Sequence, residues 1–198
     1  MDKQDMIAFF DGLASGWDAG QIHDDEKIDA ILDYAGITEN VSVLDVACGT
    51  GVLMPDYLAR GVKKVTGIDI SPVMIAMARR KFSDPRVEFF NMDIEEAALP
   101  EQYDRCMVYN AFPHFPDPSR LIEGLAGKLA LEGRLTVAHS MSRAQINRHH
   151  SGKIANYSVS LPSETELALF FRPYFNVDVA LSNDRIYVVS GTKRKSDL

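Results

Sequence analysis

Short apolar runs alternate with amphipathic segments along most of the chain, which is the pattern of buried strands separated by helices. The apolar runs expected to form strands of the core lie at 43–46, 64–70, 86–90, 103–109 and 133–138. The second run is followed by Ser71 and Pro72, which suit the N-cap and the first turn of a helix. Strands separated by helices at this spacing predict a mostly parallel sheet with both faces covered.

The last third of the chain departs from this alternation. Residues 139–162 form an irregular stretch in which only 142–150 suggests a helix. Two further apolar runs, 175–181 and 185–191, flank a short turn and predict an antiparallel hairpin. We therefore expect an α/β fold in a single domain over 1–198: a doubly wound, mostly parallel seven-stranded sheet with a C-terminal antiparallel hairpin.

The residues before the first strand carry two helical patterns, at 5–13 and 24–35. Aromatic side chains such as Phe10 lie on the apolar side of the first pattern. Two interpretations stay open: a hydrophobic cap on the core, or an N-terminal helical lid over 1–36 whose aromatic rings cover a ligand. Residues 139–162 are expected to lie on the substrate side of the site. Like residues 1–36, they do not belong to the alternating strands and helices of the core.

Residues 41–51, VSVLDVACGTG, lead from a strand through a glycine turn into a helix. Gly49 and Gly51 have no Cβ, so the backbone can approach a ligand closely, and the N–H groups of the following helix point toward it. An ordinary tight turn is the alternative, although the flanking strand and helix favour cofactor binding. Met54 stands where the nicotinamide fingerprint has its third glycine, which disfavours a dinucleotide.

Polar side chains follow the ends of the other expected strands. Asp69 ends the second strand and Asp93 follows the third, while Asn110 and His139 follow the fourth and the fifth. In a doubly wound sheet ligands bind at the carboxyl ends of the strands, so we expect these side chains to meet there. A carboxylate at Asp69 can accept both hydroxyls of a ribose, and Ser71 is available to cap the next helix in its place.

The composition narrows the class of protein. With 198 residues, 46% of them hydrophobic and 25% charged, the chain suits one soluble domain. No apolar run approaches the ~20 residues that span a bilayer, and the N-terminus lacks the apolar core of a signal peptide, so we expect a cytoplasmic protein. The net charge of −7 argues against a nucleic-acid partner, because phosphate binding depends on Lys and Arg. Cys48 and Cys106 form neither a zinc motif nor a redox pair.

Taken in order, the motifs VLDVACGTG, GIDIS, NMDIEE and YDRCMVYNAFPHF, followed by the terminal hairpin, resemble those of class I S-adenosylmethionine-dependent methyltransferases. The N-terminal FFDGLASGWD is similar to the segment before the core in the branch that includes ubiquinone and menaquinone biosynthesis methyltransferases. One departure is Ala47, which replaces the first glycine of the commonest pattern. The resemblance implies a Rossmann-like fold, S-adenosyl-L-methionine as cofactor and a small-molecule methyl acceptor.

The resemblance also implies a set of cofactor-binding residues. The set is Asp45, Ala47, Gly49, Gly51, Asp69, Ile70, Met74, Asp93, Ile94 and Asn110. In this set the glycines of the turn line the methionine part, Asp69 binds the ribose hydroxyls, and Asp93 accepts a hydrogen bond from the adenine amino group. Ile94 donates its backbone N–H to the adenine. For the apolar members Ile70 and Met74, packing in the core is an equal alternative.

The methyl group of this cofactor is already activated, so transfer needs mainly alignment, and a base only where the acceptor arrives protonated. The catalytic candidates are Tyr109, His114 and His139. His149 and His150 also belong to the expected substrate site, but adjacent residues on a helix point about 100° apart, so they cannot easily serve one ion together. A divalent metal held by His114, His139 and His149 is the less favoured alternative, because scattered histidines more often shape a substrate site.

Methyl transfer to a small molecule is the function that these residues favour. The alternatives are a protein that binds S-adenosylmethionine or S-adenosylhomocysteine without catalysis, and a metal-dependent methyltransferase. Met54 and the terminal hairpin count against a nicotinamide-dependent oxidoreductase. No motif names the acceptor. We expect no nucleic-acid or membrane partner, and the oligomeric state stays open, with a homodimer as the candidate.

Overall fold

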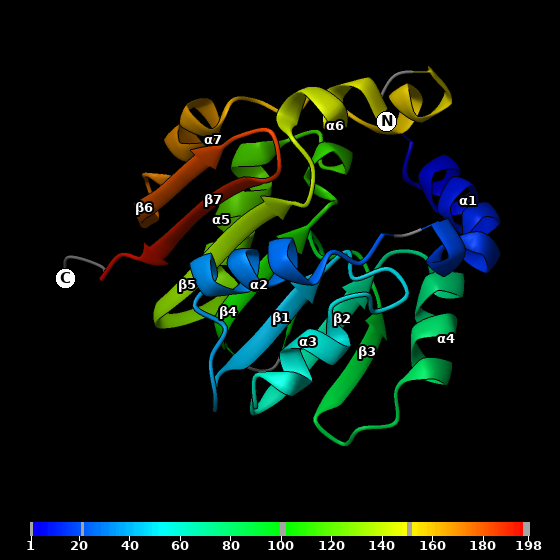
Figure 1. Ribbon diagram of the computed structural model, residues 1–198, viewed down its shortest axis with the longest axis horizontal. Coiled ribbons are helices and arrows are strands. Elements are labelled where there is room, and N and C mark those ends of the chain that lie inside the picture. The colour runs from blue at the N-terminus through cyan, green and yellow to red at the C-terminus, as the bar shows by residue number, and fades with distance from the viewer. Residues whose placement is uncertain (1, 21, 100–101, 150–151, 196–198) are drawn as a thin grey trace.

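The computed structural model describes residues 2–20, 22–99, 102–149 and 152–195, and its centre is a seven-stranded sheet (Figure 1). The strands are β1 (Ser42–Val46), β2 (Lys64–Asp69), β3 (Val87–Asn91), β4 (Tyr103–Tyr109), β5 (Leu129–His139), β6 (Phe175–Ser182) and β7 (Tyr187–Lys193). They lie in the order β3-β2-β1-β4-β5-β7-β6. The first five run parallel, and β7 pairs antiparallel with both β5 and β6. The predicted α/β fold with its terminal antiparallel pair is confirmed.

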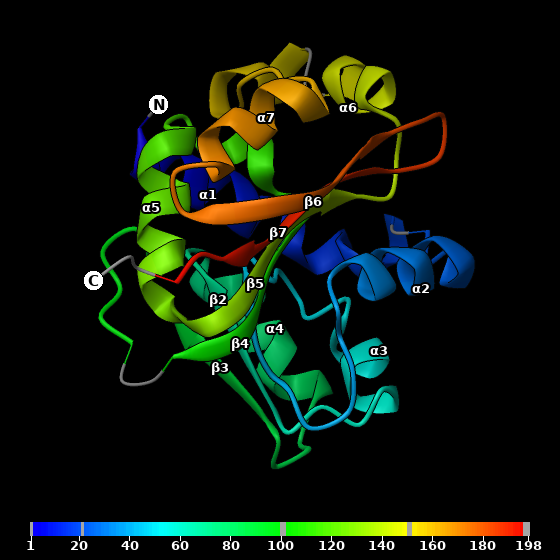
Figure 2. The same cartoon turned by 90° about the vertical axis from the view of Figure 1, so that its left-hand side faces the viewer.

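Helices cover both faces of the sheet, as the turned view in Figure 2 shows. They are α2 (Asp25–Tyr34), α3 (Met54–Ala59) and α4 (Pro72–Lys81) on one side, and α5 (Pro118–Lys128), α6 (Arg143–His149) and α7 (Glu164–Phe171) on the other. A hydrophobic cluster fills each layer. Val43 of β1 packs in the cluster with α2, α3 and α4, whereas Leu44 and Val46 pack in the cluster with α5 and α7. Successive side chains of a strand point to opposite faces, so a central strand needs an apolar run.

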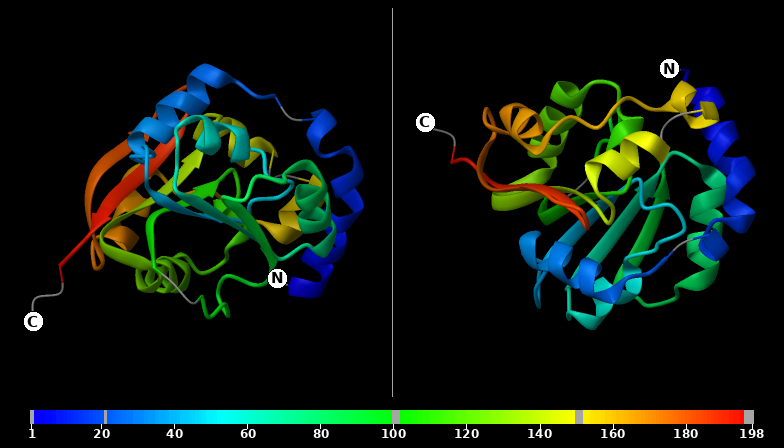
Figure 3. Two further views of the ribbon diagram at one scale, coloured as in Figure 1. Left: turned by 90° about the horizontal axis from the view of Figure 1, so that it is seen from below. Right: turned by 45° about the horizontal axis from the view of Figure 1, so that its top comes forward.

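Residues 2–20 lie over the carboxyl ends of the parallel strands. They form α1 (Lys3–Leu13) and two short 3-10 turns, η1 (Ala14–Gly16) and η2 (Asp18–Gly20). Figure 3 shows α1 beside α4 and apart from α2. None of the residues of α1 is buried, whereas α2 buries Ile28 and Ile31 in the core. The N-terminal segment therefore has two parts, one packed on the sheet and one placed over the strand ends.

Some boundaries differ from those expected. Strand β5 begins at Leu129 and not at 133, because Leu129 already pairs with Tyr103 before the register shifts at Arg105. The turn of the terminal hairpin is longer than expected, since the Asn183 side chain accepts hydrogen bonds from the N–H groups of Arg185 and Ile186 and closes the turn. Two further 3-10 turns, η3 (Phe112–His114) and η4 (Gly152–Tyr157), lie near the strand ends.

Within the described ranges, no helix has both the length and the apolar character needed to cross a bilayer. A cytoplasmic location stays a prediction from the sequence. The single domain over 1–198 and the limits of the lid at 1–36 and of the substrate-side segment at 139–162 also stay predictions.

Candidate functional site

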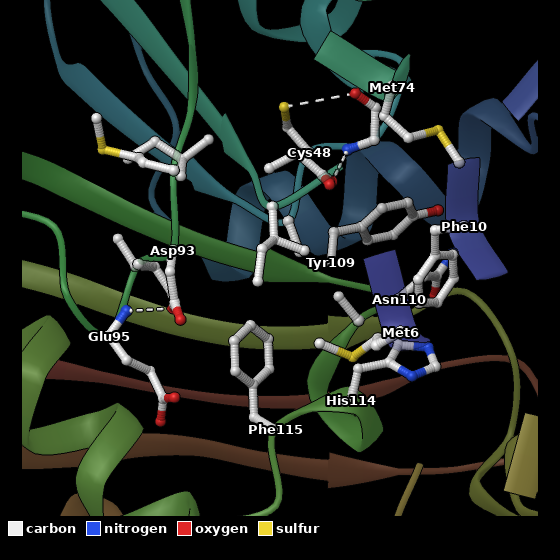
Figure 4. Close-up of a pocket in the computed structure, with 18 of the residues that line it drawn as sticks. Met6, Phe10, Cys48, Met74, Asp93, Glu95, Tyr109, Asn110, His114 and Phe115 are labelled. Atoms are coloured by element: carbon white, nitrogen blue, oxygen red, sulfur yellow. Dashed lines mark hydrogen bonds between the residues drawn. The ribbon is translucent and has the colours of Figure 1, made fainter. Parts of the chain in front are cut away.

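A pocket opens at the carboxyl ends of β1, β2 and β4, beneath α1 and its following turn (Figure 4). Its walls come from the glycine turn, the residues after β2, β3 and β4, and the N-terminal segment. The lining residues are Lys3, Met6, Phe10, Trp17, Ala47, Cys48, Gly49, Val52, Ile68, Asp69, Ile70, Met74, Met92, Asp93, Ile94, Glu95, Tyr109, Asn110, Ala111, His114, Phe115 and Pro116. Segments far apart in the sequence thus converge where a doubly wound sheet binds its ligands.

The backbone of the glycine turn after β1 is left-handed at Ala47, Gly49 and Gly51, a conformation that favours glycine. Ala47 and Gly49 both have φ of 55° and Gly51 has φ of 83°. A Cβ on Gly51 would lie 2.9 Å from the Phe82 ring, so this glycine serves the packing of the turn and does not line the pocket. A Cβ on Gly49 would meet only the Trp17 indole nitrogen, at 3.5 Å. Gly49 therefore leaves the pocket wall open to a ligand beneath the N-terminal segment.

Asp69 stands at the end of β2, where its carboxylate faces the pocket. One oxygen accepts a hydrogen bond from the Gly49 N–H and the other accepts from the Ser71 N–H, both at 2.8 Å. Burial raises the pKa of Asp69, and these two N–H groups oppose the rise. Ser71 caps α4 through its own hydroxyl, as expected. Since each carboxylate oxygen can accept a second hydrogen bond, Asp69 retains acceptor capacity for a pair of hydroxyl groups.

A second carboxylate group lies at the other end of the cofactor half, in the turn after β3. One oxygen of Asp93 accepts from the Glu95 N–H at 2.9 Å, the contact drawn as a dashed line in Figure 4, and the other accepts from the Lys3 ammonium. Ile94, between Asp93 and Glu95 in the sequence, is 5% exposed. The Glu95 side chain is 9% exposed and lines the same part of the pocket. This end of the pocket therefore combines two carboxylates with one ammonium group.

The residues after β4 line the opposite end of the pocket. Asn110 has φ of 54°, and its side chain is held by Ser140, accepting from the Ser140 N–H at 3.0 Å and donating to its hydroxyl at 3.1 Å. Burial raises the pKa of Tyr109. His114 Nδ1 lies 2.7 Å from the backbone carbonyl oxygen of Tyr157 in η4. Because a carbonyl only accepts, this contact places a proton on Nδ1 and, in the neutral ring, makes Nε2 an acceptor.

Aromatic rings cover this second end. Phe10 of α1 meets the His114 ring edge to face, with centroids 4.9 Å apart, and lies 6.0 Å from Trp17. The neighbouring Phe9 lies 4.8 Å from Tyr157. Helix α1 therefore connects the turn after β4 with η4 through apolar contacts.

The structure does not bring every predicted site residue to the pocket. Asp45 is 2% exposed in the layer below the glycine turn, and Gly51 faces Phe82. His139 is 1% exposed and stacks edge to face on the Tyr187 ring at 6.0 Å. His149 is exposed at the end of α6. The other expected cofactor residues, Ala47, Gly49, Asp69, Ile70, Met74, Asp93, Ile94 and Asn110, all line the pocket, as do Tyr109 and His114.

The histidines considered as metal ligands are not gathered in one place. Among the residues that the structure describes, no group of three or more His, Cys, Asp or Glu side chains is arranged to hold a metal ion. His150 lies outside the described residues. His114, His139 and His149 therefore form no common site in the described part of the chain.

Sequence patterns did not indicate several residues of the pocket. Lys3 reaches it only because α1 docks on the strand ends, which no local pattern encodes, whereas Met6 belongs to the apolar side of the helix that was expected as a lid. Glu95 could have been predicted from the sequence. It lies two residues after Asp93 in the same turn, so the acidic residue Asp93 marks its position near the pocket. Pro116 follows the motif that ends at Phe115 and continues the wall of the pocket beyond it.

Comparison with known proteins gives a consistent set of matches. Residues 43–133 match the family model described as a methyltransferase domain. The chain is 30% identical to a malonyl acyl-carrier protein O-methyltransferase of Acetivibrio thermocellus over 167 residues, which is 83% of this chain and 59% of that protein. It is 34% identical to a ubiquinone biosynthesis O-methyltransferase of Pseudomonas savastanoi over 127 residues, 59% of this chain and 54% of that one. The chain thus spans less than two thirds of the length of these relatives.

Solved structures share the fold at low sequence identity. The N-methyltransferase NodS of Bradyrhizobium japonicum, in complex with S-adenosyl-L-homocysteine, superposes with a TM-score of 0.73 at 14% identity, covering 98% of this chain and 100% of that one. A methyltransferase from Aquifex aeolicus has a TM-score of 0.70 at 18% identity, with the same coverage.

Proposed function

The chain belongs to the class I S-adenosylmethionine-dependent methyltransferases, in the branch that includes the ubiquinone biosynthesis enzymes, and we propose that it methylates a small molecule that loses a proton during transfer. Its cofactor is S-adenosylmethionine. The observation that carries the proposal is the contact of His114 Nδ1 with the Tyr157 carbonyl in the wall of the same pocket that holds Asp69 and Asp93.

The pocket has the groups that this cofactor requires. Gly49 leaves room for the methionine part, since a side chain there would project toward Trp17. Asp69 retains acceptor capacity for the two ribose hydroxyls, and Asp93 presents a carboxylate to the adenine amino group. When bound, S-adenosylmethionine supplies a methyl group that is already activated by the positive sulfur. Ile70 and Met74 line the pocket and supply apolar contact for the adenine ring.

His114 is the proposed general base. The Tyr157 carbonyl keeps the proton on Nδ1, so Nε2 accepts the proton that the acceptor releases as its bond to the methyl group forms. Phe10 packs against the imidazole ring and limits its rotation. Asn110 is held by Ser140 and therefore gives this wall a fixed shape. The protein's contribution is alignment of the acceptor and removal of one proton.

The charges of the pocket suggest the class of acceptor. Of the described residues that line it, Lys3 is the cation, and it lies beside Asp93 and Glu95 at the adenine end. The end near His114 presents aromatic and aliphatic groups together with the imidazole, the Tyr109 hydroxyl and the Asn110 amide, all of them uncharged in their neutral forms. A carboxylate acceptor would need a positive partner there, because an unpaired charge in an apolar pocket is unfavourable. We therefore favour a flat, neutral acceptor with an ionisable hydroxyl or ring N–H.

Residues 2–20 are the proposed lid, since they contribute Lys3, Phe10 and Trp17 to the walls of the pocket. The 139–162 segment acts on the substrate side through Tyr157, which contacts both Phe9 and His114. The net charge of −7 favours a small molecule over a nucleic acid as acceptor.

Titration calorimetry with S-adenosylmethionine, S-adenosylhomocysteine and NAD tests the cofactor, and tight binding of NAD alone would contradict the proposal. The acceptor is tested with matched pairs on one ring system, such as 2-naphthol and 2-naphthoic acid, with formation of S-adenosylhomocysteine as the readout. Turnover of the hydroxyl compounds and not of the acids is expected. Cofactor binding without turnover of any member would favour the non-catalytic alternative. A requirement for added metal after chelation would favour the metal-dependent one.

A further inference from the structure

Lys3 is the first residue of α1, and it reaches the turn after β3. Its ammonium donates to one oxygen of Asp93 and lies 3.2 Å from Glu95 and 3.5 Å from Glu96. The other Asp93 oxygen accepts from the Glu95 N–H. Lys3 therefore sits on the Asp93 oxygen opposite the backbone donor, where its ammonium competes with an adenine amino group for the same acceptor.

We propose that Lys3 limits the preference of the pocket for a 6-amino purine: the adenine amino group must displace it from Asp93, and Lys3 then keeps its contacts with Glu95 and Glu96. The inference rests on the proposed function, in which Asp93 receives the adenine. The exchange requires no movement of the helix backbone, because all three carboxylates already lie around the ammonium.

The purine 6-position explains why the place of the ammonium matters. A 6-amino group donates hydrogen bonds and suits a free carboxylate, whereas a 6-oxo group accepts and suits an ammonium. While Lys3 stays on Asp93, the adenine end offers a donor to the purine. Once Lys3 leaves Asp93 and keeps its contact with Glu95, the same end offers the acceptor oxygen of Asp93. The position of one lysine thus changes how strongly the pocket prefers a 6-amino purine.

Glu95 is the main alternative partner. Its side chain is 9% exposed, compared with 71% for Glu96, so water screens the charge of Glu95 much less. Arg120 of α5 lies 3.8 Å from Glu95 and is 60% exposed, which leaves Glu95 available to Lys3. Glu95 is buried, and Arg120 is the more distant of its two described cationic neighbours, so Glu95 can hold the ammonium of Lys3 after its displacement.

The remainder of the N-terminal segment keeps its own contacts during this exchange. Asp11 accepts from the Ser71 hydroxyl at 2.5 Å. Asp18 accepts from the Thr50 hydroxyl at 2.5 Å and from the Lys81 ammonium at 2.9 Å. Because these contacts hold residues 11 to 18 independently of Asp93, the displacement of Lys3 opens one ion pair and not the whole lid.

The test compares S-adenosylhomocysteine with S-inosylhomocysteine, its 6-oxo counterpart, by calorimetry on the full chain. Lys3→Met should tighten S-adenosylhomocysteine binding by roughly two- to fivefold, the scale of a partly exposed ion pair, without tightening the 6-oxo ligand. Glu95→Gln should weaken S-adenosylhomocysteine binding by a similar factor in wild type but not in the Lys3→Met background, since the competing ammonium is then absent.

Two matched variants serve as controls. Arg120→Gln removes a cation from the same Glu95 without touching the lid, and the ratio of the two affinities should stay within about twofold of wild type. Lys3→Arg keeps the charge and should retain the wild-type preference to a similar extent. Thermal melting checks that every variant is folded.

Weaker binding of S-adenosylhomocysteine to Lys3→Met, or an unchanged ratio of the two affinities, would overturn the role of Lys3. Such a result leaves the proposed function standing, because wild type still binds S-adenosylhomocysteine. Failure of wild type to bind S-adenosylhomocysteine at all would instead remove the proposed function, and this inference with it.

Discussion

Asp45 gives the sharpest test of the charges beneath the glycine turn. Its side chain is 2% exposed, on the side of β1 that faces α3. Burial, with a smaller contribution from the charge of Asp69, raises its pKa from 3.8 to about 8. The folded chain therefore keeps this carboxyl group mostly protonated at neutral pH, whereas the unfolded chain releases the proton near pH 4.

The sign of the effect follows from which state holds the proton. The folded state binds it more tightly, so the contribution to stability is complete below pH 3.8 and is lost as the pH rises to about 8. A difference of about 4 pKa units corresponds to at most roughly 6 kcal/mol in the free energy of unfolding, at ~1.4 kcal/mol per unit. Relaxation of the buried site reduces this limit, and we expect roughly 2–5 kcal/mol.

The assay is urea denaturation at constant ionic strength from pH 5 to pH 8.5, on wild type and Asp45→Asn. The free energy of unfolding of wild type should fall with pH relative to the variant, because the amide group of the variant cannot ionise. Burial also raises the pKa of Asp69, but that group is present in both proteins and cancels in the comparison. A difference between the two proteins that stays constant over this range would refute the reasoning.

Asp104→Asn is the control. Burial opposes the ionised form of Asp104, but hydrogen bonds from Ser42 outweigh burial and lower the pKa of Asp104. This variant should therefore not reproduce the effect.

Other predictions concern the site itself. His114→Gln should lower kcat by roughly 10²–10⁴ and remove the lower inflection from the pH profile of kcat. The affinity of this variant for S-adenosylhomocysteine should stay within about threefold of wild type. His23→Gln, at an exposed site, should change neither kcat nor its pH profile. Asp69→Ala should weaken S-adenosylhomocysteine binding by roughly 10- to 100-fold in calorimetry, since two hydrogen bonds to charge are lost. Gly51→Ala should lower the free energy of unfolding by at least about 1 kcal/mol in urea denaturation, because its φ is 83° and the new Cβ meets Phe82; Gly12→Ala, with open space around it in α1, should be neutral or mildly stabilising.

The core of the fold was predictable because its signals are local. The apolar runs of β1 and β4, the Ser71 cap and the terminal hairpin each specify an element without reference to the others. The order of the sheet was not predicted, since β4 lies beside β1 and not beside β3, and β7 lies between β5 and β6. The early start of β5 was missed, since Leu129 belongs to the helical pattern of α5 and becomes a strand residue only by pairing with Tyr103.

The site was predictable in proportion to how closely each residue follows a strand. Asp69, Asn110 and the glycine turn lie directly at strand ends, and the topology alone brings them to the pocket. His139 is the last residue of β5, yet its buried side chain packs edge to face against the Tyr187 ring and does not line the pocket. The sequence contains no signal for which side of the last strand residue faces the ligand. Lys3 depends on the docking of an entire helix, which local patterns do not encode.

Helix α1 contributes to both ends of the pocket, and this makes the two ends interdependent. Asp11 of α1 and Asp18 of the turn that follows it contact groups of the cofactor half: the helix cap beside Asp69 and the turn that holds Gly49. On the same segment, Phe9 and Phe10 contact Tyr157 and His114 at the acceptor end. Occupation of the cofactor half therefore favours the docked position of the rings that form the acceptor wall. Because binding that stabilises one arrangement must be reciprocal, cofactor and acceptor should each strengthen the binding of the other. We expect acceptor affinity to rise when S-adenosylhomocysteine is present, and Phe10→Ala to reduce that gain while leaving Asp69 and its contacts with the cofactor unchanged.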